Sequence, residues 1–278
     1  MKTVIKNIAE LIQTETTPRK WVAGSDMKSI STIKDAFIEI EEGVITNFGS
    51  MDAWTGIKDW NNTEVIDAEG GMVFPTYCDS HTHLVFAASR EGEFADRING
   101  LSYQEIAEKG GGILNSAKTL QNTSEDTLFN DALARLNELV KLGTGAIEIK
   151  SGYGLDPENE LKMLRTIKAL NEASNATLVP TFLAAHALPS WAKTKGMNDA
   201  TYTEYMLDAC LPTIKAEGLA QFLDGFIERD YFKLTALEHL IEASAENGLP
   251  LKIHVNQFYD IGGIQMAVQA GALSVDHL

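Results

Sequence analysis

Five of the six histidines stand at, or just past, the carboxyl end of an apolar run with the pattern of a strand. These five residues are His81, His83, His186, His254 and His277. In a closed βα barrel, the carboxyl ends of the strands converge on one mouth, where active sites form. The sixth residue, His239, lies within a helical pattern, and we interpret it as an ordinary hydrogen-bonded histidine. The other five together predict one site.

The segment His81-Thr82-His83 has the spacing of a metal-binding pair. On an extended strand, residues i and i+2 point to the same side, so the two imidazoles face one point. His254, on a distant strand, adds a third nitrogen. Three protein nitrogens leave positions open for water, which is typical of a catalytic rather than a structural metal site. Cys78 comes three residues before His81, and we expect it to be a small buried strand residue.

Two other charged residues end predicted strands. For Lys150 and for Glu228 we favour the role of an ion-pair partner over that of a catalyst. The run Gly110-Gly111-Gly112 has the composition of a phosphate-binding loop, but no strand leads directly into it and no G-K-[ST] follows. We therefore expect a close-packed turn there.

Alternating strand and helix patterns form the frame that positions these residues. The apolar runs are Val73–Asp79, Gly145–Lys150, Thr177–Ala185, Phe222–Ile227, Leu249–Val255 and Leu273–Asp276. Helical patterns between them run from Ser124 to Leu142, from Asp156-Pro157 onward, and from Thr235 to Asn247. Such alternation predicts a parallel sheet, and continuous apolar strands predict that both of its faces are covered.

Residues 1 to about 70 have a different pattern, made of short strands and turns. Ala36 to Gly49 holds two alternating apolar runs around Glu41-Glu42-Gly43, which predicts a hairpin. We therefore divide the chain into a small β domain, residues 1–70, and an α/β domain, residues 71–278.

The composition of the 278 residues excludes several classes of protein. No apolar run reaches the roughly 18 residues of a membrane span, so we expect no membrane partner. Two cysteines make no disulfide framework, and the N-terminal segment lacks the pattern of a signal peptide, so we expect a cytoplasmic protein. A net charge of −16 argues against nucleic acid as a partner. An anionic substrate would need a local cation, and Arg90 follows His83 by seven residues.

Six motifs, in order along the chain, resemble those of the imidazolonepropionases, a family of the amidohydrolase superfamily. The motifs are D-S-H-T-H-L-V-F-A-A-S-R (79–90), K-G-G-G-I-L (109–114), E-I-K-S-G-Y-G-L (148–155), A-A-H-A-L-P (184–189), L-K-I-H-V-N-Q (251–257) and L-S-V-D-H-L (273–278). H-T-H alone is typical of the whole superfamily. S-G-Y-G-L together with A-A-H-A is narrower and makes the resemblance specific.

The resemblance implies a fold and a reaction. The fold is a (β/α)8 TIM-type barrel, of which this chain would hold six of the eight strands, with the small N-terminal β domain as part of a composite β-sandwich. The reaction is hydrolysis of the cyclic amide of 4-imidazolone-5-propanoate to N-formimidoyl-L-glutamate in histidine degradation. The partner is thus a small-molecule substrate, and a homodimer stays open.

The resemblance also implies the site residues. One zinc or iron ion would be held by His81, His83 and His254, and by an aspartate at the end of an eighth strand. The substrate contacts would come from Arg90, Tyr103, Tyr153, His186 and Gln257. His277 would be catalytic, as a proton shuttle or as a donor to the developing oxyanion. The chemistry fits, because a guanidinium can bind a propionate bidentately and a metal can polarise a carbonyl and activate water.

Two departures from the family pattern bear on the mechanism. Many members carry glutamate at the position of Gln257, and glutamine can bind a ring nitrogen but cannot act as a base. The chain also ends after its sixth strand, so we expect a fragment that lacks the aspartate, is inactive by itself, and is either poorly soluble or dependent on a partner for its fold. Two alternatives stay open: another amidohydrolase acting on a cyclic amide or amidine, and a remnant without catalysis.

Overall fold

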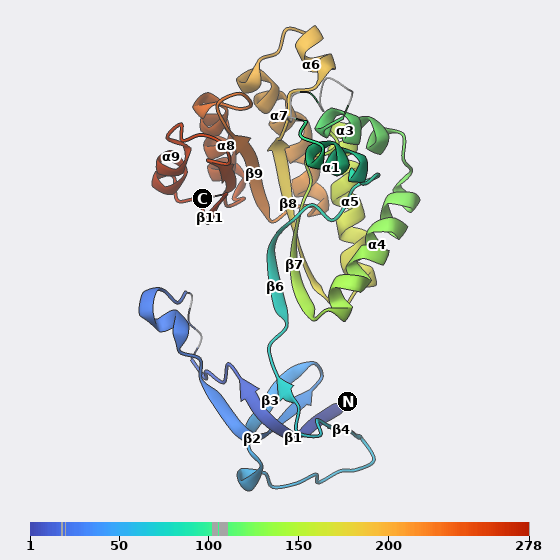
Figure 1. The fold of residues 1–278 in the computed structure, drawn as a ribbon, viewed down its shortest axis with the longest axis vertical. Coiled ribbons are helices and arrows are strands. Elements are labelled where there is room, and N and C mark those ends of the chain that lie inside the picture. The colour runs from blue at the N-terminus through green and yellow to red at the C-terminus, as the bar shows by residue number, and fades with distance from the viewer. Residues whose placement is uncertain (18, 20, 102–104, 106–110, 278) are drawn as a thin grey trace. The chain divides into compact units, whose positions relative to one another are not determined.

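The computed structural model describes residues 1–17, 19, 21–101, 105 and 111–277 (Figure 1). Contacts between residues divide the chain into two compact units, Met1–Thr76 and Tyr77–Leu278. The first is a small sheet, and the second is an α/β unit that contains all of the strand-end histidines.

A mixed sheet forms the described part of the first unit. Its strands are β1 (Lys2–Ile12), β2 (Thr32–Glu41), β3 (Val44–Ser50), β4 (Thr63–Asp67) and β5 (Met72–Val73), in the order β3-β2-β1-β4 with β5 also on β1; short 3-10 helices are η1 (Gly24–Lys28) and η2 (Met51–Ala53). The antiparallel pair β2–β3 confirms the predicted hairpin. Its turn residues Glu42 and Gly43 both have positive φ, as a two-residue hairpin turn requires.

Parallel strands run through the second unit in sequence order. They are β6 (Tyr77–Thr82), β7 (Thr144–Lys150), β8 (Thr177–Ala185), β9 (Phe222–Ile227), β10 (Lys252–Val255) and β11 (Ser274–Asp276). Each strand pairs in parallel with the next, which is the connectivity of a βα barrel. The predicted strands Thr177–Ala185 and Phe222–Ile227 coincide with β8 and β9.

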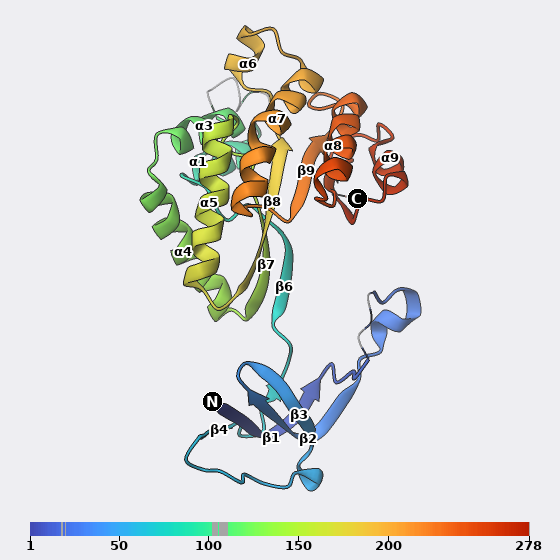
Figure 2. The ribbon, with the colours of Figure 1, turned by 180° about the vertical axis from the view of Figure 1, so that it is seen from behind.

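Helices connect these strands, and several of them pack against one face of the sheet. They are α1 (Glu91–Ile98), α3 (Ile113–Gln121), α4 (Glu125–Lys141), α5 (Pro157–Ala173), α6 (Ser190–Thr194), α7 (Asp199–Glu217), α8 (Leu234–Asn247) and α9 (Gly263–Gln269). Figure 2 shows α5, α7 and α8 in front of the strands, and Figure 1 shows the same sheet from its other face. As predicted, the Ser124 and Asp156 side chains cap α4 and α5.

The first strand of the α/β unit begins later than the sequence predicts. Val73 pairs with Leu11 in the small sheet, and the segment between β5 and β6 contains Pro75, which has no N–H to donate to a ladder. The expectation that Cys78 is buried is also wrong. Cys78 is exposed because β6 lies at one end of the strand order and pairs only with β7 among the described strands.

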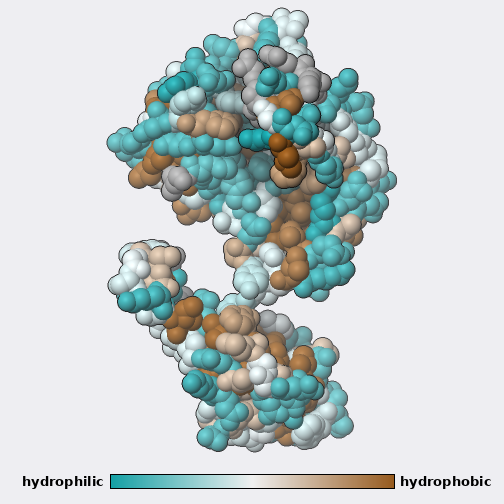
Figure 3. All heavy atoms as spheres, in the orientation of Figure 1, coloured by the Kyte–Doolittle hydropathy of each residue, from teal (hydrophilic) through white to brown (hydrophobic). Residues whose placement is uncertain are grey.

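The surface of the α/β unit is mostly polar on the face drawn in Figure 3, in keeping with the net charge of −16. Among the described helices, none has the length and hydropathy needed to cross a membrane.

Candidate functional site

A cavity of about 530 Å³ lies at the carboxyl ends of the strands in the α/β unit. All five strand-end histidines line it, and Arg90, Tyr153 and Gln257 line it with them. His239 lies on α8 and lines a different depression of the surface. The structure therefore gathers the candidate residues that it describes into one site. Tyr103 lies outside the described residues.

His81, His83 and His254 bring one ligand atom each to within 4.8 Å of one another. The ring centroids of His81 and His254 are 4.5 Å apart, and those of His81 and His83 are 5.5 Å apart. Between the two histidines of β6, Thr82 turns the other way and donates a hydrogen bond of 2.6 Å to the Glu148 carbonyl. Strand alternation thus aims the H-x-H pair at His254.

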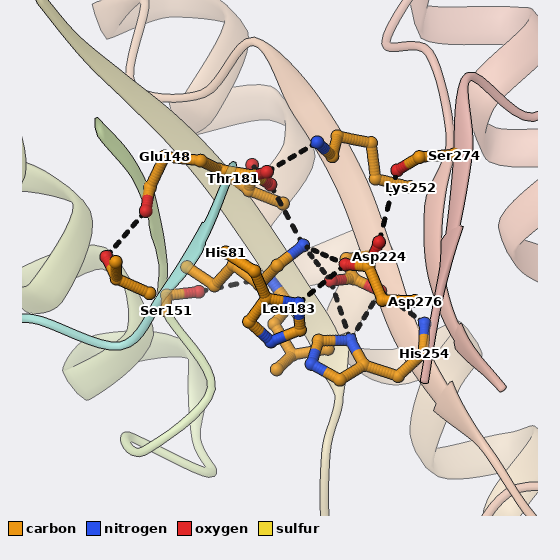
Figure 4. A network of polar contacts seen from close by, with 12 residues as sticks. His81, Glu148, Ser151, Thr181, Leu183, Asp224, Lys252, His254, Ser274 and Asp276 are labelled. Carbon is orange, nitrogen blue, oxygen red and sulfur yellow. Dashed lines mark hydrogen bonds and ion pairs between the residues drawn. The ribbon is translucent and has the colours of Figure 1, made fainter. Parts of the chain in front are cut away.

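Two carboxylates fix the orientation of two of these rings, as Figure 4 shows. His81 Nδ1 lies 2.7 Å from Asp276 Oδ2, and His254 Nδ1 lies 2.9 Å from Asp224 Oδ2. A carboxylate only accepts, so each Nδ1 carries a proton, and in the neutral form of each ring Nε2 keeps its lone pair.

The third ring has an unpaired nitrogen. His83 Nδ1 is buried and has no hydrogen-bond partner among the described residues. A divalent cation fits a cluster of converging imidazoles whose outer nitrogens are held by carboxylates. The described residues therefore form a candidate metal site.

Burial lowers the pKa of the histidines around this cluster. Desolvation, then the neighbouring His186, holds the pKa of His83 well below its ordinary value. Burial lowers the pKa of His186 to about 4, and it also lowers the pKa of His277. These three rings are therefore neutral near pH 7, which is the form that binds a metal or accepts a proton.

The carboxylates behind the histidines have the opposite environment. Burial alone would raise the pKa of Asp224, but His254 and then Lys150 outweigh it and lower that pKa to about 2. Asp276 is also buried in part, and His81 and Lys150 hold its pKa below the ordinary range. Both side chains are therefore ionised at pH 7.

The S-G-Y-G-L loop after β7 forms one wall of the cavity. His186 Nδ1 donates to the Gly152 carbonyl at 2.8 Å, and its ring stacks on His83 with centroids 5.5 Å apart. The Tyr153 ring lies 5.4 Å from the rings of both His83 and His186. The buried Glu160 carboxylate secures the loop, because it accepts backbone N–H bonds from Gly152, Gly154 and Leu155. Tyr153 and His186 are thus held beside the candidate metal site.

Arg90 stands at the N-cap of α1 and faces the same cavity. Its Nη1 lies 3.6 Å from Glu93 Oε2, while Glu93 Oε1 accepts the Gly112 N–H at 2.7 Å. The Arg90 side chain is 39% exposed and lines the cavity, so it can reach a ligand there. Arg90 therefore places one cation beside the histidine cluster.

Strained backbone surrounds the site. Leu155, Asn256 and His277 have φ of 57°, 56° and 68°, values that residues other than glycine rarely adopt. Each follows the carboxyl end of a strand, at β7, β10 and β11. Such strain is typical of functional sites, where the surrounding structure fixes a side chain in place.

Sequence reasoning missed the carboxylates behind the histidines, Asp224 and Asp276. The sequence does carry a signal for Asp224. It lies two positions from the cavity residue Phe226 on β9, and residues two positions apart on a strand point to the same face.

The interpretation of Lys150 as an ion-pair partner is confirmed. That of Glu228 is wrong for the described residues, because its carboxylate accepts backbone N–H bonds from Arg229, Phe258 and Tyr259 and joins the loops after β9 and β10.

Curated relatives of the chain share one name. Over the whole chain, it is 50% identical to the imidazolonepropionase of Christiangramia forsetii and 49% identical to that of Flavobacterium johnsoniae. The imidazolonepropionase of Clostridium tetani is 36% identical over 99% of the chain. The chain belongs to the imidazolonepropionase family. It spans 66% of the length of the first two relatives and 64% of the third. No model of a protein family matches it.

Solved structures of other enzymes share the fold of this imidazolonepropionase family member. A triazine hydrolase from Arthobacter aurescens has a TM-score of 0.62 at 15% identity, with 96% of this chain and 56% of that one covered. A 5-methylcytosine deaminase from Klebsiella pneumoniae has a TM-score of 0.61 at 16% identity, with 97% and 55% covered. An atrazine chlorohydrolase from Arthrobacter aurescens, complexed with zinc, has a TM-score of 0.58 at 15% identity, with 97% and 58% covered. These likenesses confirm the fold class, six strands of a TIM-type barrel with a small N-terminal sheet.

Proposed function

We propose that this chain forms the metal- and substrate-binding part of an enzyme that hydrolyses 4-imidazolone-5-propanoate to N-formimidoyl-L-glutamate. One observation carries the proposal: a cluster of three imidazoles shares a cavity with an arginine, in a chain half identical to two imidazolonepropionases. The substrate has a cyclic amide to be opened and a carboxylate to be bound. The cavity offers a separate group for each task.

His81, His83 and His254 would hold one zinc or iron ion. When bound, such an ion supplies Lewis acidity, which activates water and polarises a carbonyl. The neutral state of His83 and the carboxylates on the outer nitrogens of His81 and His254 favour binding of a cation.

Arg90 would bind the propionate of the substrate. A protein with a net charge of −16 gives an anion no long-range attraction, so a local guanidinium must supply the affinity. Glu93 contacts Arg90 at 3.6 Å, and the described part of the chain shows no other ion pair of the guanidinium, which leaves its other N–H groups there for a bidentate contact. We infer that this contact sets the orientation of the ring over the histidines.

Tyr153, His186 and Gln257 would orient the imidazolone ring, with Tyr103 a further contact implied by the family. Because Nδ1 of His186 donates to the Gly152 carbonyl, its Nε2 is a hydrogen-bond acceptor. Gln257 brings an amide that both donates and accepts, so it can bind a ring nitrogen without exchanging a proton.

His277 would accept or return a proton at an imidazole nitrogen. Its ring centroid lies 5.1 Å from those of both His81 and His254, which puts it beside the reacting carbonyl in this proposal. Burial lowers its pKa, so the ring is neutral at pH 7 and able to take up a proton.

We further infer that the N-terminal unit is part of a composite β-sandwich, that the α/β unit is part of a (β/α)8 barrel, and that the enzyme works in the cytoplasm.

The experiment is an assay of ring opening with zinc or iron supplied. Because the chain spans 66% of its relative from Christiangramia forsetii, it is tested alone and also followed by the remaining C-terminal part of that relative. We expect the extended protein to hydrolyse 4-imidazolone-5-propanoate and the chain alone to be inactive. Among the described strands, β6 and β11 each have a partner on one side only, so the barrel is not closed and two strand edges are unpaired. Preference of the extended protein for another cyclic amide or amidine would contradict the proposed substrate. No turnover of any of these compounds would contradict the proposed hydrolase activity.

A further inference from the structure

We propose that Lys150 is a positioning residue, which holds the Asp224 and Asp276 side chains against the outer nitrogens of His254 and His81. In this role its single ammonium group orients two of the three candidate ligands at once. The inference rests on the proposed function only for the identity of the group that the histidines bind.

Lys150 lies at the end of β7, and its side chain is fully buried. Its Nζ lies 2.8 Å from Asp224 Oδ2 and 3.3 Å from Asp276 Oδ2. The same Oδ2 of Asp276 contacts His81 Nδ1, and the same Oδ2 of Asp224 contacts His254 Nδ1. The ammonium group thus joins two carboxylate–histidine pairs from four different strands, β6, β9, β10 and β11.

Charge explains why a lysine is needed at this position. Asp224 is completely buried, and Asp276 is 16% exposed, so water solvates neither side chain well. Two carboxylates that share a buried site repel each other unless a cation lies between them. With Lys150 absent, the two side chains would separate or turn, and the rings of His81 and His254 would lose their acceptors.

A second buried lysine provides a matched control. Lys252 contacts the Oε2 atom of Glu148 (Figure 4). The Oε1 atom of Glu148 lies 2.9 Å from Lys150 Nζ. No contact between Lys252 and Asp224 or Asp276 is found in the described residues. Lys150→Met and Lys252→Met therefore remove the same charge from one cluster, but only the first removes it from the carboxylates behind the histidines.

The first readout is the tautomer of each imidazole in the metal-free extended protein, measured by 15N NMR with labelled histidine. We expect His81 and His254 of the unsubstituted protein to carry the proton on Nδ1. Lys150→Met should shift both rings toward Nε2–H, and Lys252→Met should leave them unchanged.

The second readout is the zinc dissociation constant, from competition with a chromogenic chelator. Loss of groups that orient metal ligands typically costs about 10- to 100-fold in affinity, and we expect a loss of that size for Lys150→Met. Lys252→Met should keep the affinity within about twofold, although both variants should lower the melting temperature.

Equal effects of the two substitutions on tautomers and affinity would overturn the proposal, as would no effect of Lys150→Met. If Lys150→Met does not fold, Lys150→Met with Glu148→Gln restores the charge balance of the cluster, and the same shift is expected. An unsubstituted protein that binds no zinc would contradict the proposed function, whereas the tautomers would still decide the role of Lys150.

Discussion

Gly152→Ala should destabilise the protein and displace a substrate-binding residue. Gly152 has φ of +105°, and an added Cβ would lie 2.6 Å from Leu183 Cδ2 and 2.8 Å from His186 Nδ1. The left-handed backbone costs a residue with a Cβ about 1–2 kcal/mol, and overpacking of a buried site costs about 1–3 kcal/mol more. The expected loss of stability is therefore about 2–5 kcal/mol.

Gly196→Ala is the control that separates these two costs. Gly196 also has a positive φ, +75°, but an added Cβ would meet nothing within 4 Å. It should show only the backbone cost, so the two variants should differ by the overpacking of about 1–3 kcal/mol. For a domain of this size, about 2–4 °C in melting temperature corresponds to each kcal/mol, so Gly152→Ala should melt about 2–12 °C below Gly196→Ala.

The assay is thermal unfolding of both variants, followed by circular dichroism. In the extended protein, Gly152→Ala should also raise KM for 4-imidazolone-5-propanoate, because His186 donates to the Gly152 carbonyl and its ring would be pushed away. Equal melting temperatures of the two variants would refute the close packing of this loop. An unchanged KM would refute the place of His186 in substrate binding.

Three further substitutions test other parts of the site and its support. Arg90→Ala in the extended protein should raise KM about 10- to 150-fold without loss of metal, the equivalent of about 1.5–3 kcal/mol for a charge-assisted contact. Arg165→Ala removes an exposed ion pair and should leave KM unchanged. An equal rise of KM in both variants would exclude Arg90 from the site. Glu160→Gln should lower stability by about 2 kcal/mol, or about 4–8 °C in melting temperature, because one of its backbone donors loses an acceptor. The exposed Glu172→Gln should change little, and no difference between the two in thermal unfolding would contradict the role of Glu160 in holding the loop after β7. Ser124→Ala should lower stability by about 1 kcal/mol through loss of the α4 cap, and an unchanged urea midpoint would contradict that.

Local signals predicted much of the α/β unit. The strands β8 and β9 have the predicted ends because each is a continuous apolar run between polar or turn-forming segments. The starts of α4 and α5 were predictable because Ser124 and Asp156 cap the first turn by contacts within three residues. These features depend on neighbours in sequence.

Features that depend on distant neighbours were not predictable. Val73 has the composition of a barrel strand residue, but its partner is Leu11, more than sixty positions earlier. Cys78 was expected to be buried, and its exposure follows from the place of β6 at the end of the strand order. Both errors concern which strand lies next to which.

The candidate site also has features that follow from local patterns and features that depend on distant residues. Strand alternation and strand ends were sufficient to group His81, His83 and His254, because the geometry of a barrel brings strand ends together. The partners behind them were not found, because Asp224 and Asp276 acquire a role only when five strands place them beside the histidines and Lys150. A buried aspartate in an apolar run is visible in the sequence, but its partner is not.

The most direct test of the metal site is the zinc content of the purified extended protein after loading and desalting. We expect about one ion per chain, held by the three imidazoles. Replacement of His81, His83 and His254 together by alanine should remove it, and His239→Ala should keep it. Zinc retained by the triple variant, or lost from His239→Ala alone, would contradict the site.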